Sequence, residues 1–231
     1  MKQKLFAEFL GTFTLVFAGT GAIVINSISN GAIGHVGIAL TFGLVVLAMI
    51  HTFGDISGAH FNPAVTIEFA AAGRFSSKGV LPYVGIQLLG AFSASALLRW
   101  MFPTHTTLGA TVPVGSEYRS FVLEFILTAI LMLVILSVST GAKEKGITAG
   151  IAIGAVIALE AMFAGPICGA SMNPARSFGP ALMSKQTSQL WIYLAAPILG
   201  ALFAIVCCRS VRGAGCCSNN PNKAASETVS N

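Results

Sequence analysis

Two seven-residue stretches decide the fold of this 231-residue chain: Gly58-Ala59-His60-Phe61-Asn62-Pro63-Ala64 and Gly169-Ala170-Ser171-Met172-Asn173-Pro174-Ala175. Both end in Asn-Pro-Ala, and helix-compatible residues follow each of them. Asn is favoured at the cap that precedes a helix, and Pro is favoured at its first position. Each stretch therefore predicts a turn that leads directly into a short helix.

The segments around these stretches, residues 54–73 and 165–184, are rich in Gly, Pro, Ser and Asn but still moderately apolar. They are too interrupted to cross a membrane and too apolar to lie in water. Non-helical backbone at membrane depth is tolerated only where protein or a water-filled cavity satisfies its polar groups. We therefore expect both segments to be re-entrant loops, which enter and leave the membrane on the same side.

The composition is that of an integral membrane protein. Hydrophobic residues make up 55% of the chain and charged residues 9%, against about 25% charged in typical soluble domains. This excludes a soluble enzyme and a nucleic-acid binder. Six segments are long and apolar enough to span a bilayer: 5–25, 35–53, 81–100, 121–139, 147–164 and 189–207. The first is not a signal peptide, because it is too long, contains Glu8 and lacks a small-residue cleavage site.

The distribution of basic residues explains the net charge of +5. If six spans alternate, only Arg99, Arg119 and Lys185 lie opposite the termini. On the side of the termini lie Lys2, Lys4, Arg74, Lys78, Lys143, Lys145, Arg209, Arg212 and Lys223. The positive-inside rule then predicts a multi-pass protein of a cell (plasma or inner) membrane with both termini in the cytoplasm. We expect a channel domain over residues 1–208 and a disordered cytoplasmic tail over 209–231.

The chain contains an internal duplication, with repeat 1 at about 1–110 and repeat 2 at about 117–208. Glu8 pairs with Glu124, Asn62 with Asn173 and Gly90 with Gly200, at offsets of 116, 111 and 110 positions. Each repeat carries three spans, an odd number, so the second copy must be inverted in the membrane. The two asparagines would then meet near the midplane, with one half-helix extending from each.

This arrangement has a chemical consequence. Each half-helix N-terminus carries about half a positive charge, so cations and protons are repelled where the two converge. The asparagine amides donate hydrogen bonds without carrying an ionisable group. A neutral molecule with an oxygen acceptor can bind both and pass.

The paired boxes, His60-Phe61-Asn62-Pro63-Ala64-Val65-Thr66 and Ser171-Met172-Asn173-Pro174-Ala175-Arg176-Ser177, resemble those of the major intrinsic protein (aquaporin) family. The resemblance covers residues 5–207. It implies an all-α membrane protein with six transmembrane helices and two re-entrant half-helices. It also implies a homotetramer in the lipid bilayer, with one pore per subunit and passive flux of water or small neutral solutes.

The selectivity of such a channel depends on Arg176, which directly follows the second box. A buried guanidinium offers several fixed donors to oxygen-bearing solutes and repels cations. The resemblance places Phe42, Ala161 and Ala170 beside it in the narrowest ring. Strict water channels of the family usually carry His at the position of Ala161. Two alanines predict a wider ring.

The segment 164–172 looks most like the plant nodulin-like intrinsic proteins and their microbial relatives. Those pass glycerol, urea, ammonia or neutral metalloid acids as well as water. Ser177 and Ala181 argue against a glycerol specialist, since aquaglyceroporins typically carry an Asp and a basic residue there. A strict water channel remains the alternative.

Four further side chains attract interest. Glu8 and Glu124 lie within spans at equivalent repeat positions; a proton relay is one interpretation, and support of the loop backbones, as the resemblance implies, is the other. Glu160 has no counterpart in the first half; lining the pore and capping loop backbone are the two alternatives for it. Cys168 is expected near the outer mouth, where it is a candidate site for mercurial inhibition.

Two other classes of function share some of these features or need to be distinguished from a channel. A secondary transporter shares inverted repeats and broken helices, and would need Glu8, Glu124 or Glu160 as a coupling site. A membrane enzyme lacks support, because the four His are scattered and no catalytic, nucleotide or metal motif is present. We expect no enzymatic activity, cofactor, metal or nucleic-acid partner.

Overall fold

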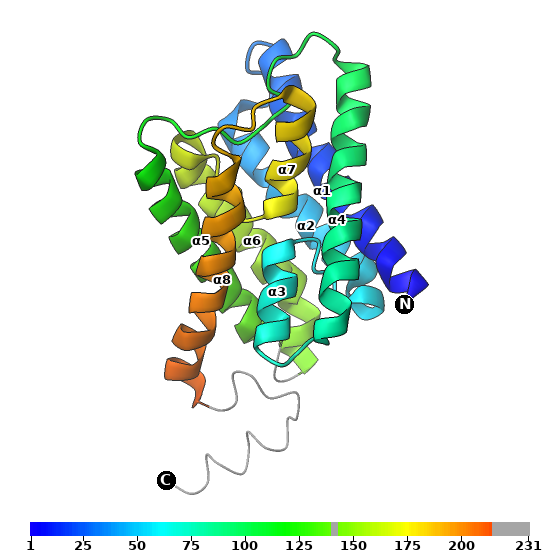
Figure 1. Cartoon of the computed structure of the whole chain (residues 1–231), viewed down its shortest axis with the longest axis vertical. Coiled ribbons are helices and arrows are strands. Elements are labelled where there is room, and N and C mark those ends of the chain that lie inside the picture. The colour runs from blue at the N-terminus through cyan, green and yellow to red at the C-terminus, as the bar shows by residue number, and fades with distance from the viewer. Residues whose placement is uncertain (140–142, 214–231) are drawn as a thin grey trace, which may run out of the picture.

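A computed structural model describes residues 1–139 and 143–213. This part of the chain folds into eight helices and contains no strand (Figure 1). The helices are α1 (Lys2–Ile28), α2 (Gly34–Ser57), α3 (Pro63–Ala71), α4 (Ser77–Met101), α5 (Glu117–Val138), α6 (Lys143–Cys168), α7 (Pro174–Ser184) and α8 (Leu190–Arg212). The N-terminus and the last turn of α8, at Arg212, lie toward the same end of the bundle (Figure 1).

The six expected spans are confirmed as α1, α2, α4, α5, α6 and α8, each of which is long and apolar enough to cross a membrane. Most extend a few residues beyond the apolar segments, because a helix continues into the headgroup region after its hydrophobic stretch ends. Helix α8 reaches Arg212. The boundary expected at residue 209 is therefore too early, and the tail from 214 onward lies outside the described residues.

The order long, long, short, long occurs twice along the chain, as α1–α4 and as α5–α8. The short helix of each half packs against the last helix of the other: α3 against α8, and α7 against α4. In Figure 1, α3 occupies the lower half of the molecule and α7 the upper half, with their first turns facing each other. The two halves thus exchange half-helices and surround one centre.

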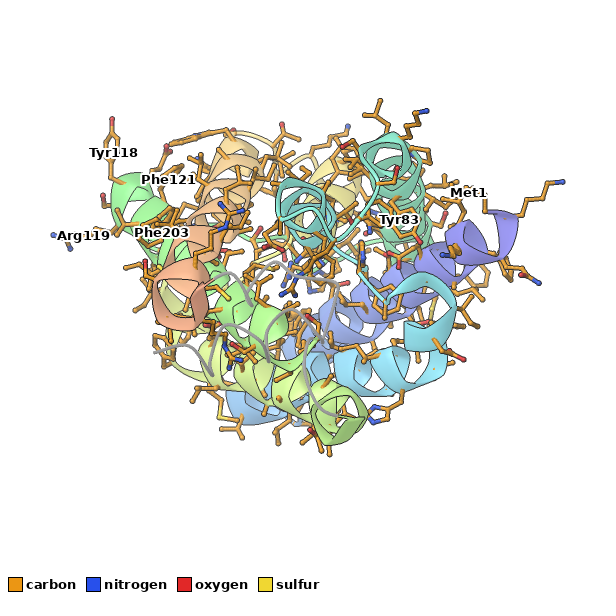
Figure 2. All side chains as sticks on the ribbon, turned by 90° about the horizontal axis from the view of Figure 1, so that it is seen from below. Met1, Tyr83, Tyr118, Arg119, Phe121 and Phe203 are labelled. Atoms are coloured by element: carbon orange, nitrogen blue, oxygen red, sulfur yellow. The ribbon has the colours of Figure 1, made fainter. Side chains whose placement is uncertain are left out.

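Glycines permit the close helix crossings. A Cβ on Gly90 would lie 2.7 Å from the carbonyl oxygen of Phe9, where α4 crosses α1, and a Cβ on Gly200 would overlap the carbonyl oxygen of Phe125, where α8 crosses α5. Small residues at such crossings allow backbones to approach closely, which is how helices associate in lipid. The outer surface carries large apolar side chains such as Phe203, and Tyr118 points away from the bundle in Figure 2.

Candidate functional site

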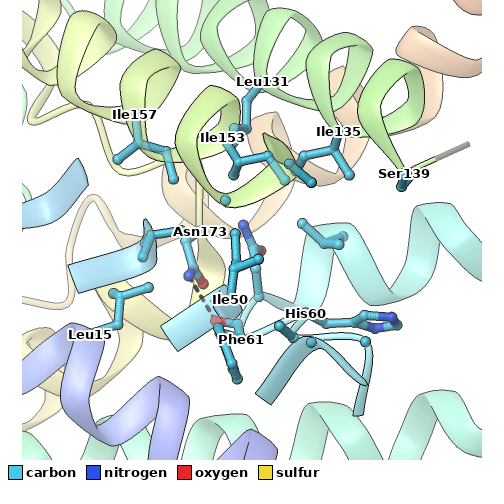
Figure 3. A pocket seen from close by; sticks show the side chains of 18 of the residues that line it. Leu15, Ile50, His60, Phe61, Leu131, Ile135, Ser139, Ile153, Ile157 and Asn173 are labelled. Atoms are coloured by element: carbon cyan, nitrogen blue, oxygen red, sulfur yellow. Dashed lines mark hydrogen bonds between the residues drawn. The ribbon is translucent and has the colours of Figure 1, made fainter. Parts of the chain in front are cut away.

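A cavity of about 800 Å³ lies between the two halves. It extends from Lys4 and Arg74, at the end where the N-terminus lies, to Phe42 and Arg176. One wall is apolar and comes from α5 and α6, where Leu131, Ile135, Ile153 and Ile157 face the loop residues Phe61 and Asn173 (Figure 3). Residues 58–62 and 170–173 of the two re-entrant loops line another side of the cavity.

Asn62 and Asn173 both line this cavity, where the two re-entrant loops meet. Each side-chain oxygen caps its own half-helix: Oδ1 of Asn62 accepts the N–H of Ala64 at 2.9 Å, and that of Asn173 accepts the N–H of Ala175 at 3.0 Å. Each side-chain nitrogen donates to the opposite loop, Asn62 to the carbonyl of Met172 (2.8 Å) and Asn173 to that of Phe61 (2.9 Å; Figure 3). The amide planes are thereby fixed, and each NH₂ group has a second hydrogen to offer.

The two loops share an unusual backbone conformation. Gly58 and Gly169 have φ of 89° and 88°, a conformation that glycine adopts without steric cost. Four non-glycine residues are also in the left-handed region: Ala59 (51°), Phe61 (50°), Ala170 (42°) and Met172 (53°). That region costs a non-glycine residue about 1–2 kcal/mol. The loops therefore need strong external support.

Two buried carboxylates supply this support. Glu8 accepts the N–H groups of residues 60 and 61 at 2.9 and 2.8 Å. Glu124 accepts those of residues 171 and 172 at 2.8 and 2.9 Å. Both carboxylates are completely buried. Both carboxylates thus accept hydrogen bonds from loop backbone. This is the arrangement expected if they support the loops, and not the one expected of a proton relay.

The structure adds supporting residues that sequence reasoning missed. Tyr83 donates its hydroxyl to the carbonyl of Ser57 (2.9 Å), and Tyr193 donates to the carbonyl of Cys168 (2.7 Å). The Ser57 hydroxyl accepts the N–H of Ala59, as the Cys168 sulfur accepts that of Ala170. Cys168 is thus the counterpart of Ser57, 111 positions later. The offset that pairs the asparagines could have revealed this.

This position corrects the expectation for Cys168. Its side chain is completely buried and is not among the residues that line the cavity. The sulfur points toward loop backbone, 3.4 Å from the nitrogen of Ala170. The prediction of an accessible thiol is therefore wrong, because the Cys168 side chain is buried where it supports the loop that carries Ala170.

Arg176 and Phe42 form the far end of the cavity. The guanidinium carbon lies 4.9 Å from the centre of the Phe42 ring, within range of a cation–π interaction. Its Nη1 donates to the carbonyl of Gly109 at 2.8 Å. The Phe42 ring occupies space that a side chain at Gly19 would fill. The sequence could not predict that Gly109 is this partner, since the backbone carbonyl of any residue can accept such a bond.

Residues 1–207 match the sequence profile described as "Major intrinsic protein". The chain belongs to the major intrinsic protein family. Over 201 residues it is 49% identical to "Aquaporin NIP1-1" of Zea mays, covering 87% of this chain and 71% of that protein. It is 48% identical to "Nodulin-26" of Glycine max, again covering 87% of this chain, and 74% of that protein. The X-ray structure of the aquaglyceroporin from Plasmodium falciparum matches with a TM-score of 0.80 and 28% identity, covering 87% and 93% of the two chains.

This major intrinsic protein is therefore a membrane channel for water and small neutral solutes, as the sequence predicts. Ala161 and Ala170 line its cavity together with Phe42 and Arg176. The structure thus brings all four expected ring residues to one passage.

The inverted repeat gives the channel a second set of four positions, 111 residues away from the first. These are also cavity-lining residues: Ile153, Ile50, Ala59 and Val65, equivalent to Phe42, Ala161, Ala170 and Arg176. The second set is entirely apolar. The two sets of positions are related by the repeat but differ in chemistry, because only the set with Phe42 carries a guanidinium, that of Arg176.

Glu160 does not line the channel. It precedes Ala161 in α6, is 1% exposed, and neither of its oxygens has a hydrogen-bond partner among the described residues. The described residues also contain no group of His, Cys, Asp and Glu that could hold a metal ion.

Proposed function

We propose that the channel conducts glycerol, urea, ammonia or neutral metalloid acids in addition to water. The observation that carries this proposal is the pair of alanines, Ala161 and Ala170, in the same lining as Phe42 and Arg176. An alanine contributes only one methyl group to the wall. A ring with two such positions leaves room for molecules larger than water.

The remaining two ring residues give the solute its orientation. Arg176 presents N–H donors to a hydroxyl or carbonyl oxygen. The Phe42 ring lies beside it and offers an apolar face to carbon atoms. An amphipathic neutral solute can use both surfaces at once, while a cation is repelled by the guanidinium.

Ion and proton exclusion is proposed to rest on the half-helices and their asparagines. The first turns of α3 and α7 begin at Asn62 and Asn173, so their positive ends converge where the two amides meet. Because Glu8 and Glu124 accept backbone hydrogen bonds, they are poorly placed to relay protons. Passive flux is therefore favoured over proton-coupled transport, and we propose no catalytic activity.

Permeability measurements separate this proposal from a strict water channel. Purified protein in proteoliposomes is tested by stopped-flow light scattering with water, glycerol, urea and boric acid, a neutral metalloid acid. We expect water and at least one solute to pass faster than through empty liposomes. Flux of water alone would refute the proposal in favour of a strict water channel, and solute flux that requires a proton gradient would favour a transporter.

We further propose that the channel is a homotetramer of the plasma or inner membrane with cytoplasmic termini. Arg74 at the mouth on the side of the termini, together with the basic residues at the start of α1, supports this orientation. Chemical cross-linking in native membranes tests the assembly. Protease accessibility of the C-terminus in right-side-out vesicles tests the orientation.

A further inference from the structure

We propose that His105 is a positioning residue for Arg176. The two are linked through one turn of the loop between α4 and α5. The His105 ring accepts the N–H of Leu108, and the carbonyl of the following residue, Gly109, accepts a hydrogen bond from the Arg176 guanidinium. This inference rests on the role proposed for Arg176 in the ring.

The bond inside the turn is well formed. The N–H of Leu108 donates to Nδ1 of His105 at 3.0 Å, and the N–H of Ala110 donates to the carbonyl of Thr107 at 2.9 Å. The Leu108 side chain is completely buried and packs in a small apolar cluster with Val24 and Leu98. The turn is thus folded on itself and anchored to α1 and α4.

Its surroundings leave Gly109 little freedom. A Cβ on Gly109 would lie 2.9 Å from Cβ of Thr20, and its φ of +72° is a value that favours glycine. Arg99 at the end of α4 donates to the carbonyl of His105 (2.7 Å) and, through its other terminal nitrogen, to that of Met183 (3.1 Å). The Gly109 carbonyl is therefore held in one direction, and the ring arginine with it.

The link depends on the charge of His105. Nδ1 accepts a hydrogen bond only in the neutral imidazole that carries its proton on Nε2. Burial, and then the neighbouring Arg99, lower the pKa of His105 below its ordinary value, so the ring is neutral near neutral pH. Arg99 is the charged group that acts on His105 in the described parts of the chain. At acid pH Nδ1 is protonated. It is then a donor itself and can no longer accept the hydrogen bond from the Leu108 N–H.

Loss of the hydrogen bond between His105 and Leu108 should reduce the permeability to large solutes more than the permeability to water. Without a fixed Gly109 carbonyl, the guanidinium of the long Arg176 side chain loses this acceptor and moves into the passage beside Phe42. Water needs less width than glycerol or urea. The ratio of solute to water permeability should therefore fall, while folding and the asparagine region stay intact.

Three variants test the proposal in proteoliposomes with equal pH on both sides. His105→Asn keeps an acceptor at the position of Nδ1 but does not titrate, His105→Leu removes the acceptor, and Thr106→Ala alters the exposed neighbour as a matched control. Wild type and Thr106→Ala should show a solute-to-water ratio that falls about three- to tenfold between pH ~7.5 and pH ~5. His105→Asn should keep the high ratio at both pH values, and His105→Leu should show the low ratio at both.

Two results would overturn the proposal. One is a His105→Leu channel with the wild-type ratio at neutral pH; the other is a His105→Asn channel that keeps the wild-type response to acid. If His105→Leu does not fold, the comparison of His105→Asn with wild type still decides. If wild type conducts no solute, the proposed solute range fails by itself, and the acid response of water permeability in wild type and His105→Asn decides the role of His105.

Discussion

At the scale of single residues, Asn173 combines three functions in one amide. Its oxygen caps α7, its nitrogen ties the loop to the carbonyl of Phe61, and the group as a whole carries no charge. Asp at this position keeps an oxygen that caps α7, but it lacks the N–H donor to the Phe61 carbonyl and it carries a negative charge. Asn173→Asp therefore places a carboxylate where two half-positive helix ends converge. We predict a cation current in voltage-clamped membranes, where wild type shows none.

The matched comparison is Asn62→Asp, which makes the same change in the first half. Asn62 also caps its half-helix and donates to the opposite loop, so its variant should conduct cations as well. Folded Asn173→Asp protein without a cation current would show that the helix dipoles and neutral amides are not the main barrier to ions.

Cys168 gives a second prediction at this scale. Cys168 occupies the position equivalent to Ser57 of the first half, and its sulfur accepts the N–H of Ala170 as the Ser57 hydroxyl accepts that of Ala59. Cys168→Ser should therefore keep the free energy of unfolding within about 1 kcal/mol of wild type. Cys168→Val removes the acceptor and should cost about 1–3 kcal/mol, the price of an unpaired buried N–H. Thermal unfolding in detergent measures both.

The same burial predicts that thiol reagents do not label Cys168 in the folded channel. Labelling followed by peptide mass spectrometry should find it modified only after denaturation. Rapid labelling of native protein at Cys168, with loss of water flux, would contradict the buried position.

At the scale of elements, the helix crossings depend on glycine. Gly200 lies where α8 meets the backbone of α5, and an added Cβ would overlap the carbonyl oxygen of Phe125. Gly200→Ala should therefore lower stability by about 1–3 kcal/mol through overpacking. Gly85 in α4 is the control, because nothing lies within 4 Å of an added Cβ there. Gly85→Ala should be neutral or slightly stabilising. Equal unfolding temperatures for the two variants would refute the argument.

Most of these elements could be predicted, because their signals are local. Apolar length predicted the six spans, and Asn followed by Pro predicted the starts of α3 and α7. The ends of the helices were predicted less accurately. Polar residues at the headgroup level continue a helix beyond its apolar segment, and α8 for this reason extends to Arg212.

The supporting contacts were harder to predict, for two different reasons. Tyr83 and Ser57 recur as Tyr193 and Cys168 at the repeat offset, so a full comparison of the halves would have found them. The Gly109 carbonyl has no such signal. Its role depends on where the loop folds back over Thr20, and that is a property of the tertiary structure alone.

At the scale of the whole molecule, the inverted repeat supplies a nearly symmetric framework and an asymmetric passage. Both halves use a buried carboxylate, a capped half-helix and a tyrosine to hold the loop. Only the half opposite the termini carries a charged group in its ring, at Arg176, where the equivalent residue is Val65. Discrimination between solutes should therefore be concentrated at one ring, and changes in the other set should affect flux more than selectivity.

The decisive change for that ring is Ala161→His. Imidazole fills the space beside Phe42 and Arg176 and adds a hydrogen-bond donor, which suits water but leaves less width for carbon-bearing solutes. Water permeability should persist, while the ratio of glycerol or urea to water permeability should fall roughly tenfold or more. The ratio cancels differences in the amount of reconstituted protein, and Ala161→Gly, which keeps the ring wide, should retain the wild-type value. If Ala161→His conducts solutes as well as wild type does, the width of this ring does not set the solute range, and the narrowest point must lie elsewhere along the cavity.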